Sequence, residues 1–420
     1  MKKLSIFLML ILLFATISSI AFAGDTVIKF WHTYNMQTDE GKVMNEVVIP
    51  AFEKEHPGVK VESLQIPYDE FRKKLLISIA GGKGPDIVRV DIIWVPEMAK
   101  EGLLTNLSQE FGEEFDEYKS KVFPGPLSTN YYNGSYYGIP LDTNTRVMMW
   151  NKKLFQAAGI NKPPTTFAEF KEIAKKLTKD TDSDGKIDQW GVAVGGPWPW
   201  HILPWIWSNG GLITDSGLTR STGYLNSPES VGALQLLVDL YKDGYMAETI
   251  VGGGEDTGAG YGSDHYGIIF GGPWFWPIIK GQFPDKELDF ALYPYGAGTQ
   301  SISVVGGENI IIPVTSKHKD VTWEFAKHLL SEDVQVKMAE TGQIPVISSV
   351  VDTEYFKSHS YFGIFMEQLK TAKARTVHPQ WNRIKEELHK AFEAAILGKM
   401  SSQEALDKAA NEIDKILKMK

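Results

Sequence analysis

The chain has 420 residues and a formal net charge of −9, with 43% hydrophobic and 23% charged residues. This length suggests two or more domains with ample core, and the composition is that of an ordinary globular protein. An acidic chain without basic tracts argues against nucleic acid and anionic membrane surfaces as partners. The absence of cysteine excludes disulfides and lipid attachment through cysteine.

The first residues have the pattern of a secretory signal peptide. Met1-Lys2-Lys3 precedes an apolar run from Leu4 to Ile20, and the small-x-small box Ala21-Phe22-Ala23 follows. A single membrane anchor is the alternative, but the polar residues within the run weaken it. We therefore expect residues 1–23 to be removed as a signal peptide. The expected location is the periplasm, and the protein is not expected to be a lipoprotein.

Strands and helices alternate in the first part of the chain. Strand patterns at 26–31, 59–62 and 87–90 are separated by helix patterns. The first helix is predicted to pack through Val43, Val47, Ala51 and Phe52. Such alternation predicts an α/β fold with a mainly parallel sheet, in which ligands lie beyond the carboxyl ends of the strands. The candidate ligand-binding residues at these ends are Trp31, His32, Gln65 and Asp91.

A turn near residue 140 joins two apolar runs. Gly138-Ile139-Pro140 is followed by the polar residues 142–145 and then by the apolar run 147–150. Proline fixes φ and removes a donor, and glycine frees the backbone, so one strand should end and another begin in a new direction. From these residues alone, an ordinary strand–turn–strand connection is predicted.

The same stretch carries a family resemblance. Tyr-Gly-Ile-Pro at 137–140, followed from residue 150 by Trp-Asn-Lys-x-Leu-Phe-x-x-Ala-Gly-Ile-x-x-Pro-Pro-x-Thr, is similar to the hinge crossing of family-1 extracellular solute-binding proteins. These are the sugar-binding receptors of ABC importers, of the maltose-binding type. Further motifs at 82–86, 306–309 and 342–345 follow in the family's order. The resemblance therefore spans nearly the whole mature chain.

The resemblance implies a two-lobed periplasmic-binding-protein fold of type II, each lobe a mainly parallel sheet flanked by helices. The N-terminal lobe would comprise residues 24–140 and 293–343, and the C-terminal lobe residues 141–292 and 344–420. Three segments would cross between the lobes, at 137–145, 292–304 and 342–347. The implied ligand is an oligosaccharide, the implied partners are the permease subunits of an ABC transporter, and the chain is expected to be a monomer without nucleic acid.

An acidic loop precedes Trp190. Carboxylates at loop positions 1, 3, 5 and 9, with glycine at position 6, match the spacing of a calcium loop. Position 12 is Gly191 in place of the closing glutamate. Two alternatives therefore remain open, a partial structural calcium site and an unoccupied acidic turn, and no other cofactor is expected. The candidate metal residues are Asp180, Asp182, Asp184, Lys186 and Asp188.

Tryptophan is unusually frequent, with 12 in the chain. Burial in the core is the ordinary explanation for any one of them. A sugar, however, has an apolar face that flat rings cover and hydroxyls that carboxylates bind. In the resembled family a Gly-x-Trp turn places a tryptophan against the sugar, which points to Trp274, and the glycine-rich turn that contains Glu308 lies in the cleft. The remaining candidates for the sugar site are Asp142, Trp200, Trp207 and Trp381.

Other classes of protein share some of the features of a transport receptor. A secreted glycoside hydrolase would also be rich in tryptophan and acidic residues, and it needs two carboxylates about 5 to 10 Å apart across the scissile bond. A lectin that serves no permease is a further alternative. A zinc enzyme is disfavoured because the nine histidines include no metal-binding helix pair, and serine catalysis is disfavoured because Gly-x-Ser-x-Gly is absent. We expect a binding protein and not an enzyme.

Overall fold

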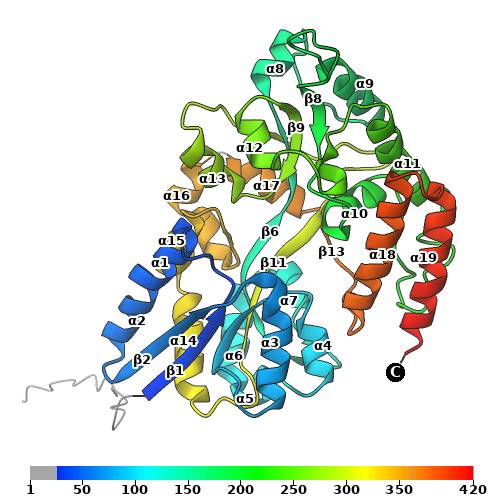
Figure 1. Ribbon diagram of the computed structural model, residues 1–420. Coiled ribbons are helices and arrows are strands. Elements are labelled where there is room, and N and C mark those ends of the chain that lie inside the picture. The colour runs from blue at the N-terminus through cyan, green and yellow to red at the C-terminus, as the bar shows by residue number, and fades with distance from the viewer. Residues whose placement is uncertain (1–25, 360, 420) are drawn as a thin grey trace, which may run out of the picture.

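The computed structural model describes residues 26–359 and 361–419. The predicted signal peptide, residues 1–23, lies outside this range. The chain forms two lobes joined by strands: the first strands and helices lie in the lower lobe of Figure 1, and the segment from α8 to α13 lies in the upper lobe. Within the described residues, no helix is both long and apolar enough to cross a membrane.

The lower lobe is built on a seven-stranded sheet of order β12-β6-β11-β3-β1-β2, with β13 also paired to β11. Its strands are β1 (Thr26–His32), β2 (Val59–Gln65), β3 (Ile87–Asp91), β6 (Ile139–Thr145), β11 (Val304–Ile311), β12 (Ile344–Pro345) and β13 (Lys373–Ala374). A separate hairpin consists of β4 (Tyr131–Tyr132) and β5 (Ser135–Tyr136).

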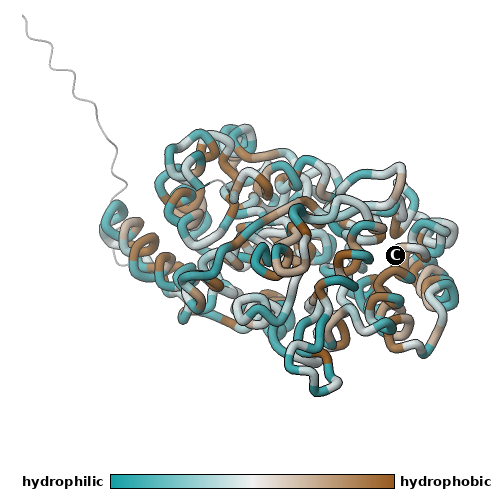
Figure 2. Tube along the Cα trace, turned by 90° about the horizontal axis from the view of Figure 1, so that it is seen from above, coloured by the Kyte–Doolittle hydropathy of each residue, from teal (hydrophilic) through white to brown (hydrophobic). Residues whose placement is uncertain are grey.

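Hydrophobic and hydrophilic residues alternate along the helical coils of the chain, as in amphipathic helices (Figure 2). The helices of the lower lobe surround its sheet (Figure 1). They are α1 (Asp39–Val43), a π-helical turn (Met44–Val48), α2 (Ile49–Glu55), α3 (Tyr68–Ala80), α4 (Val95–Lys100), α5 (Leu107–Glu110), α6 (Gly112–Lys121), α7 (Pro124–Ser128), α14 (Lys319–Leu329) and α15 (Glu332–Ala339). A 3-10 turn follows at Ser348–Asp352.

The upper lobe has a four-stranded sheet of order β10-β7-β9-β8. Its strands are β7 (Val147–Trp150), β8 (Trp190–Ala193), β9 (Tyr266–Gly271) and β10 (Asp289–Ala291). Its helices are α8 (Lys152–Ala157), α9 (Phe167–Leu177), α10 (Pro199–Ser208), α11 (Pro228–Lys242), a 3-10 turn (Glu248–Val251), α12 (Thr257–Gly262) and α13 (Phe275–Gln282). The capping box predicted at Thr166 is present at the start of α9.

The C-terminal segment comprises α16 (Glu354–Ser358), α17 (Tyr361–Leu369), α18 (Trp381–Ile396) and α19 (Ser402–Leu417). Helices α18 and α19 form an antiparallel pair beside α10 and α11 (Figure 1). Their predicted apolar stripes face the core: Ile384, Leu388 and Phe392 are fully buried. The capping box predicted at Ser401 starts α19.

The α/β class is confirmed, but the expectation of mainly parallel sheets is wrong. In the first sheet β1 runs parallel to β2 and β3, whereas β11 runs antiparallel to β3 and β6. In the second sheet only β8 and β9 are parallel. Both sheets are mixed because strands that cross between the lobes enter them from the opposite end.

The lobe borders expected from the sequence do not coincide with the sheets. Strand β6 belongs to the first sheet up to Thr145, so the border expected after residue 140 falls inside this strand. Only Arg146 separates β6 from β7 in the second sheet. Strands β12 and β13, expected in the C-terminal lobe, also pair within the first sheet.

The first helix packs only partly through the predicted face: Phe52 is buried and Val43 packs against the core as predicted. Its buried side chains include Met44, Val48, Ile49 and Phe52, whereas Val47 is exposed. The cause is the π-helical turn between α1 and α2, because its wider turn rotates the following residues relative to a regular 3.6-residue period.

Candidate functional site

A cavity of about 720 Å³ lies where the two lobes meet. Its lining comes from β3, β6 and β11 of the first sheet, from α10 and the turn before α13 in the upper lobe, and from the C-terminal segment. This volume is in the range of pockets that enclose a small molecule. The charged and aromatic side chains of the lining are Glu40, Tyr68, Asp69, Arg89, Asp91, Asp142, Trp198, Trp200, His201, Trp274, Glu308, Arg375, Trp381 and Lys385.

Six of the ten side chains proposed from the sequence line this cavity. They come from β3, β6, β11, α10, α18 and the turn before α13, and they are Asp91, Asp142, Glu308, Trp200, Trp381 and Trp274. The structure thus brings three carboxylates and three indole rings into one space, as a sugar site requires.

Four proposed residues lie elsewhere. His32 is fully buried and bonds Ser63, Gln65 accepts a bond from the amide of Met36, and Trp31 packs against the core. Strand β2 is the edge strand of the sheet and β1 lies between β2 and β3, whereas the cavity lies over β3, β11 and β6.

Trp207 is the fourth proposed residue outside the cavity. It is buried in the core behind α10, together with Trp205. Seven residues separate Trp200 from Trp207, which is about two helical turns, so their rings emerge at opposite ends of the helix. Trp207 therefore lies outside the cavity, although it is close to Trp200 in the sequence.

The floor of the cavity is organised around Arg89. This guanidinium projects from β3 and lies 2.9 Å from a carboxylate oxygen of Glu308, 3.3 Å from one of Glu40 and 3.4 Å from one of Asp142. The ring of Tyr34 covers it, with the guanidinium carbon 4.1 Å from the ring centre. Three carboxylates share one cation, so the cluster carries an excess of negative charge.

Burial makes that excess charge costly, and the pKa values of the three carboxyls respond. Burial raises the pKa of Glu308 well above its ordinary value, against the opposing effect of Arg89, and a hydrogen bond to Asp142 raises it further. Burial also raises the pKa values of Asp142 and Glu40, again opposed by Arg89. The raised pKa favours the protonated form of Glu308, whose carboxyl donates a hydrogen bond to Asp142, the residue opposite it in the paired strands β6 and β11.

A second network joins the lobes at Asp91. One oxygen of its carboxylate accepts bonds from Arg375 at 3.2 Å and from the amide of Ile93 at 3.1 Å, and the other accepts a bond from the Tyr68 hydroxyl at 2.7 Å. The Arg375 guanidinium also covers the ring of Trp200, 5.0 Å from its centre. A residue beyond β13 thus connects a strand end of the lower lobe to an aromatic ring of the upper lobe.

His201 contributes a fixed hydrogen-bond donor. Its Nδ1 accepts a bond from the buried guanidinium of Arg146, which also donates to the carbonyl of Phe270. Burial and the nearby Arg146 charge hold the pKa of His201 well below its ordinary value, so the ring is neutral. Because Nδ1 accepts, the ring proton is on Nε2. His201 therefore lines the cavity as a donor.

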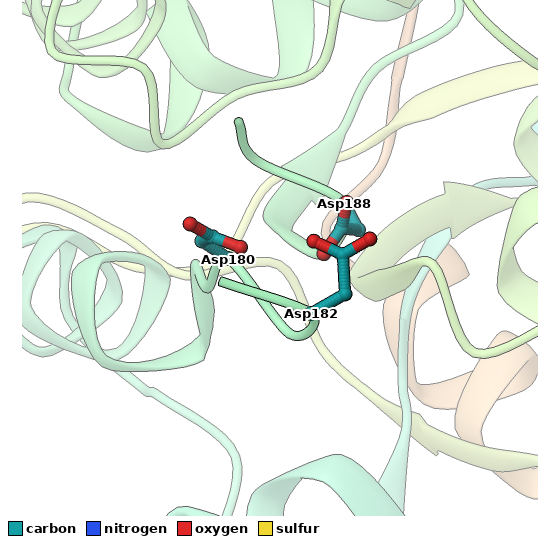
Figure 3. A group of neighbouring side chains, drawn as sticks. All are labelled: Asp180, Asp182 and Asp188. Carbon is teal, nitrogen blue, oxygen red and sulfur yellow. The ribbon is translucent and has the colours of Figure 1, made fainter. Parts of the chain in front are cut away.

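The acidic loop lies apart from the cavity. Oxygens of Asp180, Asp182 and Asp188 are within 4.8 Å of one another, which fits ligands around one calcium ion. Figure 3 shows Asp182 and Asp188 together, with Asp180 approaching from the side. Asp184 is outside this group and pairs with Lys186, whose amide and ammonium both approach it. The structure thus narrows the candidate metal residues to three carboxylates.

The fold and the cavity define a two-lobed binding protein. Residues 37–336 match the family model of the bacterial extracellular solute-binding protein, and the chain belongs to this family. The family consists of substrate-binding proteins, so the prediction that the chain is not an enzyme is confirmed, and nothing in the comparisons points to a hydrolase or a lectin.

The chain is similar to the maltotriose-binding protein of Pyrococcus abyssi, with 26% identity over 353 residues that cover 80% of this chain and 70% of the relative. It is 24% identical to the galactooligosaccharide-binding protein of Bacillus subtilis over 374 residues, covering 86% and 84% of the two chains. A crystal structure of an ABC transporter solute-binding protein from Thermotoga lettingae, bound with alpha-D-tagatose, superposes with a TM-score of 0.82 at 28% identity, covering 93% of this chain and 100% of that one.

The first prediction concerns the proton on Glu308. The folded state binds more protons than the unfolded state between the ordinary pKa of glutamate and the raised pKa, so the free energy of unfolding falls as pH rises through this window. Glu308→Gln removes this titration. We expect the melting temperature of the variant to fall less steeply than that of the wild type as pH rises above the ordinary pKa of glutamate.

The exposed Glu62→Gln is the matched control and should keep the wild-type slope. An equal slope for Glu308→Gln and wild type would show that Glu308 does not hold the additional proton.

The second prediction concerns calcium. If the three carboxylates hold the ion, chelation should lower the melting temperature, because the metal binds only the folded loop. Asp182→Asn should lower the melting temperature in calcium and remove the effect of the chelator. Melting curves with and without chelator, together with elemental analysis, check this. An unchanged melt in a protein without metal would identify the loop as a plain acidic turn.

Proposed function

We propose that the protein binds a neutral oligosaccharide in the cavity between its lobes and delivers it to the permease of an ABC importer. Solute binding on behalf of such a transporter is the function of its family. The named sugars of its relatives, maltotriose and galactooligosaccharide, support an oligosaccharide as the ligand. The observation that carries the proposal is the meeting of indole rings and carboxylates in one cavity.

The rings and the polar groups have complementary roles. Trp200 and Trp274 are half-buried and offer flat apolar surface for the C–H faces of sugar rings, with little side-chain entropy to lose, whereas Trp381 is 1% exposed and packs in the core beside the cavity. The carboxylates of Asp91 and Asp142 accept bonds from hydroxyls, and His201 donates one. Each ring that a ligand buries contributes about 1–3 kcal/mol, so two or three rings support micromolar binding or better.

The charges of the lining favour a neutral ligand. Both guanidiniums already face carboxylates, Arg89 at the floor and Arg375 at Asp91. The carboxylates outnumber the cations even when Glu308 is protonated, since Glu40, Asp69, Asp91 and Asp142 face Arg89, Arg375 and Lys385. A phosphate or a uronic acid would meet this excess negative charge and no unoccupied guanidinium, so its binding is disfavoured.

The third prediction tests the site with two variants. Trp274→Ala should weaken binding of the sugar by roughly 2–4 kcal/mol, because the ligand loses stacking area. Asp91→Ala should weaken it by a similar amount, because a ligand hydroxyl loses its acceptor and Arg375 its partner. Calorimetric titration with oligosaccharides and thermal melting of each variant measure both effects.

If Trp274 serves only packing, Trp274→Ala would lower the melting temperature while the folded protein binds with wild-type affinity. Wild-type affinity in both folded variants would exclude this cavity as the sugar site.

We further propose that the protein is exported to the periplasm as a monomer that closes on its ligand. The support for closure is that neighbouring strands join the lobes, since β6 pairs with both β11 and β12. Closure would be a hinge motion at the ends of these strands, and the ligand would favour the closed state through its contacts with both lobes.

The fourth prediction follows from closure. Small-angle scattering should give the molecular mass of one chain and a smaller radius of gyration when the sugar is added at saturation. Trp274→Ala at the same sugar concentration is the control, and it should remain less compact. An unchanged radius at saturation would contradict hinge closure for this protein.

A further inference from the structure

Arg146 is a buried cation of a different kind from Arg89. It is 3% exposed, and among the residues that the structure describes no carboxylate forms an ion pair with it. Burial lowers the pKa of its guanidinium, and the Tyr293 phenol is the group that opposes this effect. An unpaired charge in the interior is costly, and an apolar side chain of similar length would avoid that cost. The stability of the fold therefore gives no reason for a cation at this position.

The contacts of Arg146 connect several distant segments. It is the single residue between β6 of the first sheet and β7 of the second. Its carbonyl accepts a hydrogen bond at 2.7 Å from the hydroxyl of Ser303, which immediately precedes β11. Its guanidinium extends into the upper lobe, where it donates to the carbonyl of Phe270 in β9 and to Nδ1 of His201 on α10. The junction between the lobes is thus bonded directly to a residue of the cavity.

The bond from Arg146 restricts what His201 can offer. A neutral imidazole can carry its proton on either nitrogen, but a donor at Nδ1 permits only the form with the proton on Nε2. A cation at Nδ1 also polarises the ring and strengthens the Nε2–H as a donor. The ring is confined on another side by Gly195, where a Cβ would lie 2.9 Å from the ring carbon Cε1 of His201. Nε2 is therefore the ring nitrogen that remains for a ligand.

The floor of the cavity has the opposite hydrogen-bonding character. Asp91 and Asp142 line it as carboxylates, which accept hydrogen bonds and, when ionised, donate none. A sugar hydroxyl that gives its proton to a carboxylate keeps free lone pairs on its oxygen. The Nε2–H of His201 supplies a donor for such an oxygen without adding a charge to the cavity.

We propose that Arg146 is a positioning residue that determines specificity: it holds His201 in one orientation and one tautomer, so that the upper wall selects a ligand with an acceptor oxygen at this point. This inference rests on the proposed function and adds to it the residue that sets the polarity of the upper wall. A sugar with a C–H group there, such as a deoxy sugar, leaves the donor unpaired and binds more weakly.

The first test reads the tautomer of His201 without any sugar. The ring nitrogens of the nine histidines are isotopically labelled in the mature protein, and the NMR signals of His201 are those absent from His201→Phe. In the wild type, one protonated and one bare nitrogen should give two widely separated shifts. In Arg146→Met, which has a similar length but no donor, the separation should shrink because the proton moves between both nitrogens. Arg146→Lys, which keeps a donor, should retain most of the separation.

The second test asks whether Arg146 acts on the ligand through His201. Affinities for maltotriose and β-1,4-galactotriose, chosen after the sugars named for two relatives, are measured by calorimetry. We expect His201→Phe to lower the affinity about tenfold, since a bond to the ligand is lost, and Arg146→Met to lower it by about three- to tenfold. The double variant should lose no more than His201→Phe alone, because Arg146 then has no donor to orient. Arg146→Lys should restore most of the affinity.

Ser303→Ala is the matched control, because it removes a hydrogen bond at the same junction and leaves the guanidinium of Arg146 in place. It should lower the melting temperature while the shifts of His201 stay unchanged and the affinity stays within about twofold of the wild type.

Three results would overturn the role of Arg146 while the proposed function stands. They are averaged His201 shifts in the wild type, unchanged shifts in Arg146→Met, and a double variant whose loss is the sum of the two single losses. The first needs no variant to fold. Binding of neither sugar by the wild type would instead contradict the proposed function, and the shifts would still decide whether Arg146 fixes the tautomer of His201.

Discussion

The burial of Arg89 is the constraint on which the site depends. A guanidinium in the middle of a sheet needs partners, and an unpaired buried charge costs several kcal/mol. The partners come from three distant parts of the chain: Glu40 from α1, Asp142 from β6 and Glu308 from β11. Satisfying one cation therefore brings together the first helix and two of the strands that join the lobes. The ion pairs of Arg89 therefore determine how the side chains at the floor of the cavity are arranged.

The two lobes contribute different chemistry to the cavity. The lower lobe supplies most of the charged groups, through Arg89, Asp91 and the helices beside them, whereas the upper lobe supplies rings, through Trp198, Trp200 and Trp274. Neither half suffices for a sugar, which needs cover for its apolar faces and partners for its hydroxyls. A ligand gains its full set of contacts only where both halves meet, which gives the free-energy difference that closure requires.

The sequence predicted the class of fold and the elements with strong periodicity, such as α18 with its apolar stripe and α9 and α19 with their capping boxes. For the site, the rule that ligands lie at strand ends placed Asp91 correctly and failed for Trp31, because the rule does not say which strands of the sheet lie under the cavity. Sheet order depends on long-range pairing that no local pattern encodes.

One residue of the site, Arg89, was not proposed from the sequence but could have been recognised there. Arg89 interrupts the otherwise apolar strand Ile87–Asp91, and a charge in a buried strand implies carboxylates nearby. Arg375 carried no such signal, since it lies outside the regular elements and reaches Asp91 only through the pairing of β13 with β11. Trp198 and Trp207 could not be separated by composition, because only the direction of α10 decides which ring faces the cavity and which the core.

The contribution of the C-terminal segment has a consequence for biosynthesis. Arg375, Trp381 and Lys385 line the cavity, and His389 supports one of its rings, so the site is incomplete until the last tenth of the chain has emerged and α18 has packed on α10. A nascent or truncated chain could form both sheets and still lack the wall that these side chains provide. Sugar binding thus distinguishes finished molecules from unfinished ones, and a transporter that responds to the liganded receptor would respond only to complete chains.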